Sequence, residues 1–551
     1  MDVESHIKEK LKKAGIKNVR LEVPPKKEFG DYSFTCFDIA KKEKKAPQQI
    51  AKELSEKIKK DDIVSEIKVF GGYVNFYINY ESIAKDILKK ANKKNYGGNK
   101  TKKKALIEHT SINPNASPHV GRARNALIGD AVARTLKFYG YKTDIHYFVN
   151  DVGKQIAMLV LAAKRTEKKV TFENLLDMYI KINAEMITNV SLEKKVFELL
   201  EKLENGDKET IKLFEKISKI AVKGQVKIFN ELGIKYDYFD YESKYVKSRK
   251  LTNILKKFKK NVFADKEGRQ VLNLDGYDLP LREPVLVLTR ANGTSLYALR
   301  DIAYTIDKMK KSKKNIVVLG EEQKTYFKQI SAALDILGYE SPEALTYSYV
   351  LLSGGEKMST RRGNVALLSD FMAEAVEKAK EEIQNRYAKI TEKEIEKLAK
   401  IIGYGAVKYS MLRVSPDKNI IFDWDEALNF EGNSAPYLQY TYVRAKNIIE
   451  KAGKVKASKI KLEKQVEREL IKKFSEFPAI IEEISRSYKV YLLANYIFET
   501  ANLFNEFYEK CHVITEEDKE LKATRIKIVK VYKKLIEKSL NLLGIEVPDF
   551  M

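Results

Sequence analysis

The pattern of hydrophobic and polar positions divides the chain of 551 residues into three parts. From residue 1 to about 95 it predicts a small α/β unit, in which a helix that runs through Ala40 precedes a β-hairpin over 66–79. From about 391 to 551, nearly every segment repeats its apolar positions every three to four residues. This last part is therefore predicted to be an all-helical domain.

The middle part, residues 96–390, alternates short apolar runs with helical patterns. The runs lie at 105–108, 143–149, 284–289 and 315–319. Short apolar runs between helices are typical of buried strands in a parallel sheet, so an α/β fold is expected here. A long helical stretch rich in lysine and glutamate, about 152–260, is interpreted as an insertion into the sheet domain.

Lysine and arginine outnumber aspartate and glutamate by 102 to 77, which gives a net charge of +25. This balance suits a polyanionic partner such as RNA, although a surface rich in lysine and glutamate is also typical of heat-adapted proteins. The two cysteines, Cys36 and Cys511, are too few for a disulfide framework or a four-cysteine zinc site. The charged N-terminal pattern, and the lack of an apolar run of about 20 residues, predict a cytoplasmic protein that does not enter a membrane.

The run at 105–108 leads through a proline-containing loop into a helix that begins near Val120. In a parallel sheet such a helix starts at the carboxyl edge of the strands, where its free N–H groups and its dipole favour a phosphate. His119 and Arg122 can donate hydrogen bonds to phosphate oxygens, and Gly121 leaves room for a ribose or a base. A phosphate site is predicted here; the alternative is an ordinary helix cap.

The segment Pro118-His119-Val120-Gly121-Arg122 resembles the HIGH signature of class I aminoacyl-tRNA synthetases. A second segment, 354–365, resembles their KMSKS loop in the form common in arginyl enzymes, and cations on such a glycine-flanked loop can stabilise a leaving pyrophosphate. The catalytic residues that the two signatures imply are His119, Gly121, Arg122, Lys357, Met358, Ser359, Thr360 and Arg361. Those implied for ATP are Pro118, His119, Val120, Gly121, Arg122 and Lys357. The resemblance implies a Rossmann-like catalytic domain that uses ATP with Mg²⁺ and has no tightly bound metal.

The chain departs from the class pattern at two positions. Arg122 replaces the second histidine of HIGH, and Thr360 replaces the second lysine of KMSKS. Some arginyl enzymes without that lysine carry one three residues before the first HIGH histidine, but that position is Ala116 here. The candidates for the missing cation are Arg122, Arg361 and Arg362.

A pocket for arginine needs carboxylates and coplanar acceptors, because the guanidinium group is planar and permanently charged. By similarity to arginyl-tRNA synthetases, arginine is expected to contact Glu108, Asn113, His119, Tyr297, Asp301 and Gln323. The stretch 148–155 resembles one that closes the pocket, and Tyr326 stands where the family has a histidine. Structural alternatives remain open for single residues: Glu108 as a helix cap, and Asp301 as a partner of Arg300.

The resemblance covers essentially the whole chain. Residues 1–95 resemble the domain with which arginyl-tRNA synthetases grip the outer corner of the tRNA, and 391–551 resemble their anticodon-binding domain. The RNA contacts implied are Asn75, Phe76, Tyr77, Tyr437, Tyr440, Arg444 and Met551, with core packing as the alternative for each aromatic residue. Trp424 is interpreted as structural. The resemblance thus implies an arginine–tRNA ligase that acts on L-arginine, ATP and tRNA(Arg), as a monomer and with adenylate formation dependent on tRNA.

Three other functions are weighed against this hypothesis. A cysteinyl enzyme of the same class is disfavoured because cysteine clusters are missing and because Glu108 and Asp301 suit a cation. A non-catalytic RNA-binding paralogue would not be expected to keep His119, Gly121 and Lys357. A bare nucleotidyltransferase would not need the helical C-terminal part.

Overall fold

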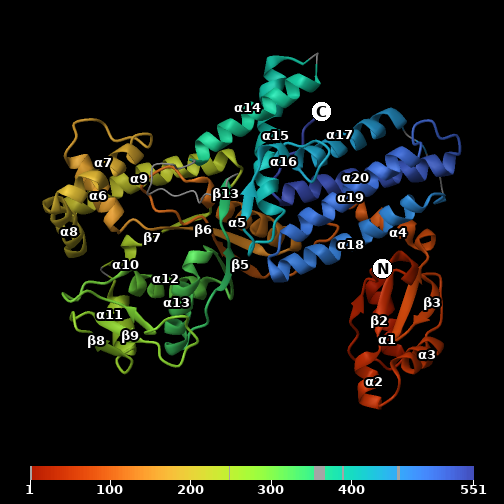
Figure 1. Ribbon diagram of the computed structural model, residues 1–551, viewed down its shortest axis with the longest axis horizontal. Coiled ribbons are helices and arrows are strands. Elements are labelled where there is room, and N and C mark those ends of the chain that lie inside the picture. The colour runs from red at the N-terminus through yellow and green to blue at the C-terminus, as the bar shows by residue number, and fades with distance from the viewer. Residues whose placement is uncertain (1–2, 247, 353–366, 388–389, 454, 456–458) are drawn as a thin grey trace.

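The computed structural model describes residues 3–551 apart from 247, 353–366, 388–389, 454 and 456–458. Figure 1 shows the N-terminal unit at one end, the sheet domain at the other, and the C-terminal helices lying beside both. Among the described residues, no helix is both long enough and apolar enough to cross a lipid bilayer.

The N-terminal unit contains an antiparallel four-stranded sheet in the order β1-β2-β4-β3. Its elements are α1 (Val3–Lys13), β1 (Leu21–Glu22), β2 (Tyr32–Thr35), α2 (Phe37–Glu43), α3 (Pro47–Lys57), β3 (Val64–Phe70), β4 (Tyr73–Ile78) and α4 (Tyr80–Ala91). The predicted hairpin is confirmed, with Gly71 at the turn in a positive-φ conformation. The predicted helix through Ala40 begins only at Phe37, because the residues before it pair with β4 instead.

The middle part contains a five-stranded, wholly parallel sheet in the order β12-β11-β5-β6-β7. The strands are β5 (Lys104–Glu108), β6 (Lys142–Val149), β7 (Tyr238–Tyr241), β11 (Lys314–Gly320) and β12 (Glu343–Tyr347). The chain runs outward from β5 to β6 and β7 on one side, and later to β11 and β12 on the other. The sheet therefore has its switch point between β5 and β11, where α/β proteins bind ligands at the carboxyl edge.

Two expectations for the middle part are corrected by the structure. The run at 284–289 forms β10 (Val285–Val287) of a separate antiparallel sheet, together with β8 (Val262–Ala264) and β9 (Gln270–Asn273). Only Leu286 of this strand is buried, so the run covers one face of a small sheet rather than the centre of a large one. The supposed insertion at 152–260 also contains β7, so only its helices leave the parallel sheet.

Helices connect and cover these strands. Those of the middle part are α5 (Val120–Tyr139), α6 (Lys154–Lys164), α7 (Leu175–Thr188), α8 (Val190–Asn205), α9 (Lys208–Glu231), α10 (Ser243–Val246), α11 (Arg249–Lys257), α12 (Tyr297–Lys311) and α13 (Lys324–Ile336). α6 to α9 pack on one another as a helical subdomain with its own apolar core.

The C-terminal part is helical, as predicted. Its helices are α15 (Glu392–Leu412), α16 (Trp424–Ala427), α17 (Ala435–Ala452), α18 (Gln465–Ser487), α19 (Tyr491–Lys510) and α20 (Lys519–Leu542), and α14 (Leu368–Arg386) of the middle part packs against α15. A short parallel pair, β13 (Val350–Leu352) and β14 (Ile420–Phe422), connects the bundle with the end of the sheet domain. Trp424 packs against Phe371 and Phe422, with each pair of ring centroids 4.8 Å apart.

The N-terminal unit is attached to the C-terminal bundle through α18. Asp31 pairs with Lys472 at 2.8 Å, and Glu81 of α4 pairs with Arg468 at 2.6 Å. The Tyr96 hydroxyl donates a hydrogen bond to the Phe474 carbonyl at 2.8 Å. Figure 1 shows α4 and α18 side by side. Segments about 400 residues apart in sequence are therefore in direct contact.

Candidate active site

The carboxyl end of the central strand β5 turns sharply into the loop before α5. Glu108 ends the strand, and Thr110 and Ser111 follow with positive φ angles of 74° and 40°. Such angles are uncommon outside glycine and persist only where neighbouring groups enforce them, often at functional sites. Asn125 of α5 provides this contact: its Oδ1 accepts the Thr110 N–H at 2.5 Å, and its Nδ2 donates to the Val318 carbonyl at 2.8 Å. α5 thereby ties β5 to β11 at the switch point.

Helix α5 begins at the same edge of the sheet, with His119 at its N-cap and Gly121 in its first turn. Burial, and then the charge of Arg122, lower the pKa of His119 to about 4, so its imidazole is neutral at pH 7. Its Nδ1 is buried and has no hydrogen-bond partner in the described part of the chain. A β-carbon on Gly121 would lie 3.2 Å from this ring, so glycine gives the ring its space. A neutral imidazole at a helix start can donate one hydrogen bond to a phosphate oxygen.

The second predicted signature falls outside the residues that the structure describes. This concerns Lys357, Met358, Ser359, Thr360 and Arg361, together with Arg362 as a candidate cation. The described residues on both sides of the gap contact α5 or the loop before it. The Leu368 N–H donates to the Pro118 carbonyl at 2.8 Å, and Arg124 donates to the Ser348 carbonyl at 2.7 Å.

Arg124 is a fully buried residue of α5 that the sequence reasoning did not single out. Its guanidinium donates to three main-chain carbonyls, those of Ser348 at 2.7 Å, Lys418 at 2.8 Å and Ser415 at 3.0 Å. Burial lowers the pKa of Arg124 to about 10, which leaves the group charged at pH 7. One side chain thus connects the start of α5 with the loop after β12 and with the loop that leads to β14.

A cavity of about 350 Å³, which we call the central cavity, opens at the carboxyl ends of β5 and β11. Four of the six residues predicted to contact arginine line it: Glu108, Asn113, Asp301 and Gln323. Arg122 also lines it and lies 3.7 Å from the Glu322 carboxylate. His119 and Tyr297 are not among the lining residues. Tyr297 is 54% exposed and its ring centroid lies 5.3 Å from that of Tyr326, which does line the cavity.

Two carboxylates give the central cavity its negative charge. Oε2 of the buried Glu108 accepts hydrogen bonds from the Tyr304 hydroxyl at 2.9 Å and from the Lys308 ammonium at 2.5 Å. Asp301 accepts one from the Tyr326 hydroxyl at 2.6 Å. Burial raises the pKa of Asp301 to about 6, so most of it is ionised at pH 7. The cavity can therefore hold a compact cation.

The structural alternatives for these two carboxylates are contradicted by the contacts. Arg300 pairs with Glu242 at 2.6 Å and not with Asp301. Glu108 does not cap the following helix, because the N-cap of α5 is His119 and it has no side-chain cap bond.

Tyr304 and Lys308 are cavity residues that the sequence reasoning missed. The only signal in the sequence was their spacing, because they follow Asp301 by three and seven residues and thus share its face of α12. The structure adds that both contact Glu108 of a strand about 200 residues earlier.

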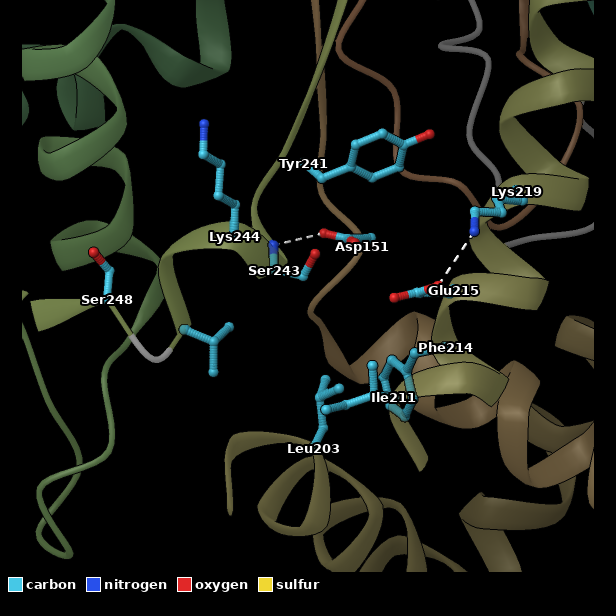
Figure 2. A pocket seen from close by; sticks show the side chains of 11 residues that line it. Asp151, Leu203, Ile211, Phe214, Glu215, Lys219, Tyr241, Ser243, Lys244 and Ser248 are labelled. Carbon is cyan, nitrogen blue, oxygen red and sulfur yellow. Dashed lines mark hydrogen bonds and ion pairs between the residues drawn. The ribbon is translucent and has the colours of Figure 1, made fainter. Parts of the chain in front are cut away.

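A second cavity of about 550 Å³, the outer cavity, lies at the carboxyl ends of β6 and β7 (Figure 2). Its polar side includes the buried Asp151, which accepts the Ser243 N–H at 2.8 Å, and the Glu215–Lys219 pair. Its apolar side comes from α8 and α9, with Leu203, Ile211 and Phe214 labelled in Figure 2. α8 and α9, which belong to the stretch interpreted as an insertion, thus form one wall of this cavity.

The stretch at 148–155, predicted to close the arginine pocket, separates the two cavities. Phe148 and Asn150 line the central cavity, whereas Asp151 lines the outer one. Gln155 accepts a hydrogen bond from the Asn113 side chain at 2.9 Å, which holds the loop before α5 against this stretch.

The N-terminal residues predicted to contact RNA are mostly unavailable. Phe76 is fully buried, and Asn75 is buried with its side chain bonded to Ser33 at 2.6 Å, so neither can meet a base in this structure. Both belong to β4, in which the side chains of residues 74 to 76 are all buried. Tyr77 is half-buried, and its hydroxyl donates to the Glu28 carbonyl at 2.6 Å. The exposed aromatic residues of this unit are instead Phe37, Phe70 and Tyr73.

The residues of the C-terminal bundle that were predicted to contact RNA also include both buried and partly exposed side chains. Tyr437 is buried and bonded to Asn502 and Asn505, so its ring is part of the core. The Arg444 guanidinium lies between two rings, 4.7 Å from the centroid of Tyr440 and 4.4 Å from that of Tyr508. Tyr508, which the sequence reasoning missed, is 46% exposed. Met551 is half-buried and packs against the hydrophobic core that the C-terminal helices share.

Known proteins resemble each part of this chain. Residues 84–424 match the family described as "tRNA synthetases class I (R), catalytic domain". Residues 438–551 match the "DALR anticodon binding domain", and 1–78 match the "Arginyl tRNA synthetase N terminal domain".

Full-length relatives agree with these matches. An arginine–tRNA ligase of Methanocaldococcus jannaschii is 39% identical, with 100% of both chains covered, and one of Methanococcus aeolicus is 36% identical, with 97% of this chain and 96% of the relative covered. The solved structure of Thermus thermophilus arginyl-tRNA synthetase superposes with a TM-score of 0.86 at 27% identity, covering 100% of this chain and 99% of that one. The cavity with two carboxylates at a switch point, the helix start beside it and these matches over the full length lead to one conclusion: the chain belongs to the arginyl-tRNA synthetase family of class I aminoacyl-tRNA synthetases.

Proposed function

We propose that the chain is an arginine–tRNA ligase, which activates L-arginine with ATP to arginyl-adenylate and transfers the arginyl group to the 3′ end of tRNA(Arg). The observation that carries this proposal is the central cavity, in which Glu108 and Asp301 lie beside the N-terminus of α5. A cation site next to a phosphate site is what the first half-reaction needs, because it brings the carboxylate of arginine close to the α-phosphate of ATP.

In this mechanism the protein supplies position and charge, and no side chain acts as a nucleophile. The guanidinium of arginine pairs with Asp301 and with the Oε1 atom of Glu108, while Asn113 and Gln323 complete the polar lining. The arginine carboxylate attacks the α-phosphorus, and the bond from that phosphorus to the bridging oxygen of pyrophosphate breaks. A hydroxyl of the terminal tRNA ribose then attacks the carbonyl carbon of the adenylate, and AMP leaves.

His119, Gly121 and Arg122 at the start of α5 are proposed to hold the ATP phosphates. His119 is neutral and donates one hydrogen bond, whereas Arg122 brings a fixed positive charge. Arg122 is thus the described candidate for the cation that Thr360 does not supply. Lys357 to Arg361 are proposed to close over the pyrophosphate. Mg²⁺ is proposed to arrive with ATP, because phosphate oxygens are the hard ligands that it prefers.

The proposed division of the chain follows three parts: 1–95 and 391–551 hold the tRNA, and 96–390 carries out the chemistry. On the RNA side, the exposed rings of Phe37, Phe70 and Tyr73 and the Tyr440–Arg444–Tyr508 cluster are the surfaces suited to unstacked bases. A monomer is proposed, as the resemblance to arginyl-tRNA synthetases implies. The cytoplasm is the proposed location because aminoacylated tRNA is consumed in translation there.

The function is tested by ATP–pyrophosphate exchange with each amino acid in turn, with and without total tRNA. We expect exchange with arginine alone, and only when tRNA is present. Exchange with a different amino acid would retain the class I reaction but refute the arginine pocket. Folded protein that binds tRNA and exchanges with no amino acid would favour a non-catalytic paralogue.

Arginine binding is expected to weaken in acid. The folded-state pKa of Asp301 is raised from 3.8 to about 6, so as pH falls through about 6 the carboxylate takes up a proton and loses its charge for the guanidinium. The KM for arginine should rise about tenfold per pH unit below that midpoint, while the KM for ATP changes less. Steady-state kinetics from pH 5 to 8 measure both values, and a flat KM for arginine across pH 6 would contradict the role given to Asp301.

Replacing Arg444 by alanine is expected to raise the KM for tRNA about 5- to 100-fold, the range for the loss of one stacking contact with a base. At saturating tRNA the kcat should change little, because the central cavity is made from other elements. Arg444→Lys is the matched variant, since it keeps the charge but not the planar group that lies between two rings. An unchanged KM for tRNA in both variants would assign this cluster to folding alone.

A further inference from the structure

Helix α12 carries a continuous stripe of functional groups along one face. Tyr297, Asp301, Tyr304 and Lys308 follow one another at intervals of four, three and four residues, which aligns them on an α-helix. Lys308 lies at the deep end of this stripe and is 3% exposed. Its ammonium is 2.5 Å from Oε2 of Glu108 and 4.9 Å from the centre of the Tyr304 ring.

The ammonium group of Lys308 is buried in a cavity that is proposed to bind a cation. Burying a charge is unfavourable unless it is paired, and by itself Lys308 would repel a guanidinium. Its pairing with Glu108 changes that balance. Oε2 of Glu108 is occupied by Lys308 and Tyr304, whereas Oε1 accepts a long hydrogen bond from the Ser111 hydroxyl at 3.5 Å. One oxygen of the carboxylate is therefore fixed and the other remains for a ligand.

The net charge of the residues around the proposed guanidinium site is the second point. Among the described residues, four charged ones line the central cavity; Arg122 is assigned above to the ATP phosphates, and the other three, Glu108, Asp301 and Lys308, sum to minus one. Arg300 and Glu242 form a separate neutral pair behind them. A single negative charge matches a single guanidinium, whereas two uncompensated carboxylates in a buried site would favour uptake of a proton.

We propose that Lys308 is a positioning and specificity-determining residue of the arginine pocket: it holds Glu108 with one oxygen directed to the substrate and sets the charge of the pocket to match one guanidinium. This inference rests on the proposed function, because it takes the central cavity as the site for arginine.

A consequence for pH follows from the groups around Asp301. Those that face it are Glu108 of β5, Glu242 before α10, Arg300 and Lys308 of α12, and Tyr326 of α13, beside which Tyr297 lies. Burial and Glu108 raise the pKa of Asp301, while the Tyr326 hydrogen bond and the charges of Arg300 and Lys308 lower it. Without Lys308 this pKa rises further, so Asp301 takes up its proton at a higher pH and arginine binding is lost earlier on acidification.

The test compares the KM for arginine between pH 5.5 and 9 in the full-length enzyme, with tRNA and ATP saturating. Lys308→Met removes the charge, Lys308→Gln removes it but keeps a hydrogen-bond donor, and Lys308→Arg keeps it. Lys310→Met, an exposed neighbour on the same helix, is the matched control. We expect the acid midpoint to move to a higher pH in the Met and Gln variants, so that their KM for arginine exceeds the wild-type value at each pH below the midpoint. The kcat should stay within about threefold of wild type, and the Arg and Lys310 variants should follow the wild-type profile.

Several outcomes would overturn the inference. One is a folded Met or Gln variant with the wild-type midpoint, even if it is less stable, because a packing role alone does not move a pH profile. If both neutral variants fail to fold, the paired change Glu108→Gln/Lys308→Met should restore folding by removing both charges together, and a failure to do so would refute the pairing. A wild-type enzyme without arginine-dependent exchange would instead refute the proposed function, and this inference with it.

Discussion

Asp301→Asn is expected to raise the KM for arginine about 100-fold and to abolish the acid dependence of that KM near pH 6. The substitution keeps the size of the side chain and an acceptor oxygen, but it removes the charge that pairs with the guanidinium. Losing one partner of a buried, charge-assisted pair costs about 2–5 kcal/mol, and about 100-fold in affinity lies inside that range. Calorimetric binding of arginine, together with exchange kinetics, measures the effect separately from catalysis.

The matched control for this substitution is Asp307→Asn. Asp307 is on the same helix but outside the central cavity, where it accepts hydrogen bonds from Lys250 and Tyr245. We expect this variant to bind arginine as the wild type does. Equal affinities for arginine in the wild type and the Asp301 variant would remove Asp301 from the site and leave Glu108 as the one carboxylate that lines it among the described residues.

Arg124→Leu is expected to lower the free energy of unfolding by about 3–5 kcal/mol, the range for removing one partner from a buried charged contact. The leucine fills much of the space but leaves the carbonyls of Ser348, Ser415 and Lys418 without their donor. A buried acceptor that loses its donor destabilises a protein more than a pair that is removed as a whole.

Urea unfolding followed by circular dichroism measures this loss, with Arg486→Leu as the control. The Arg486 side chain is 68% exposed and, within the described part of the chain, pairs with carboxylates one turn away on its own helix, so its removal should change stability by less than about 0.5 kcal/mol. Similar midpoints for the two variants would mean that the three carbonyls find water or other donors. Because the chain has several domains, the transition at the α5 region should be resolved from that of the N-terminal unit.

Local patterns allowed much of the fold to be predicted from the sequence. The runs at 105–108, 143–149 and 315–319 became β5, β6 and β11 because each is apolar and bounded by helices. The long C-terminal helices were predicted because their apolar faces repeat over many turns. By contrast β7, with the sequence YFDY, is an exposed edge strand, and nothing in its composition indicates that it pairs with β6.

The site was predictable only as far as it is encoded in contiguous motifs. Glu108, Asn113, Asp301 and Gln323 were found because each lies in a recognisable string, and the structure brings these four to one cavity. Lys308 was missed because its role depends on Glu108, which lies 200 residues earlier in the sequence. The two side chains meet because β11, which follows α12, pairs with β5. Phe76 was predicted to contact RNA from its place in a motif, but it is fully buried in this structure, since an aromatic residue in a motif can equally well form the core.

The attachment of the N-terminal unit to α18 has a consequence for how the enzyme measures an RNA. The unit is held by the ion pairs Asp31–Lys472 and Glu81–Arg468, on the same bundle that carries the Tyr440–Arg444–Tyr508 cluster. The distance between the two proposed RNA-binding surfaces is therefore set by the contacts between the N-terminal unit and the C-terminal bundle. It is not set by the catalytic domain that lies between them in sequence. Partly exposed ion pairs weaken as salt screens them. Raising the ionic strength therefore weakens the attachment of the N-terminal unit to α18 at the same time as it weakens the attraction for phosphates.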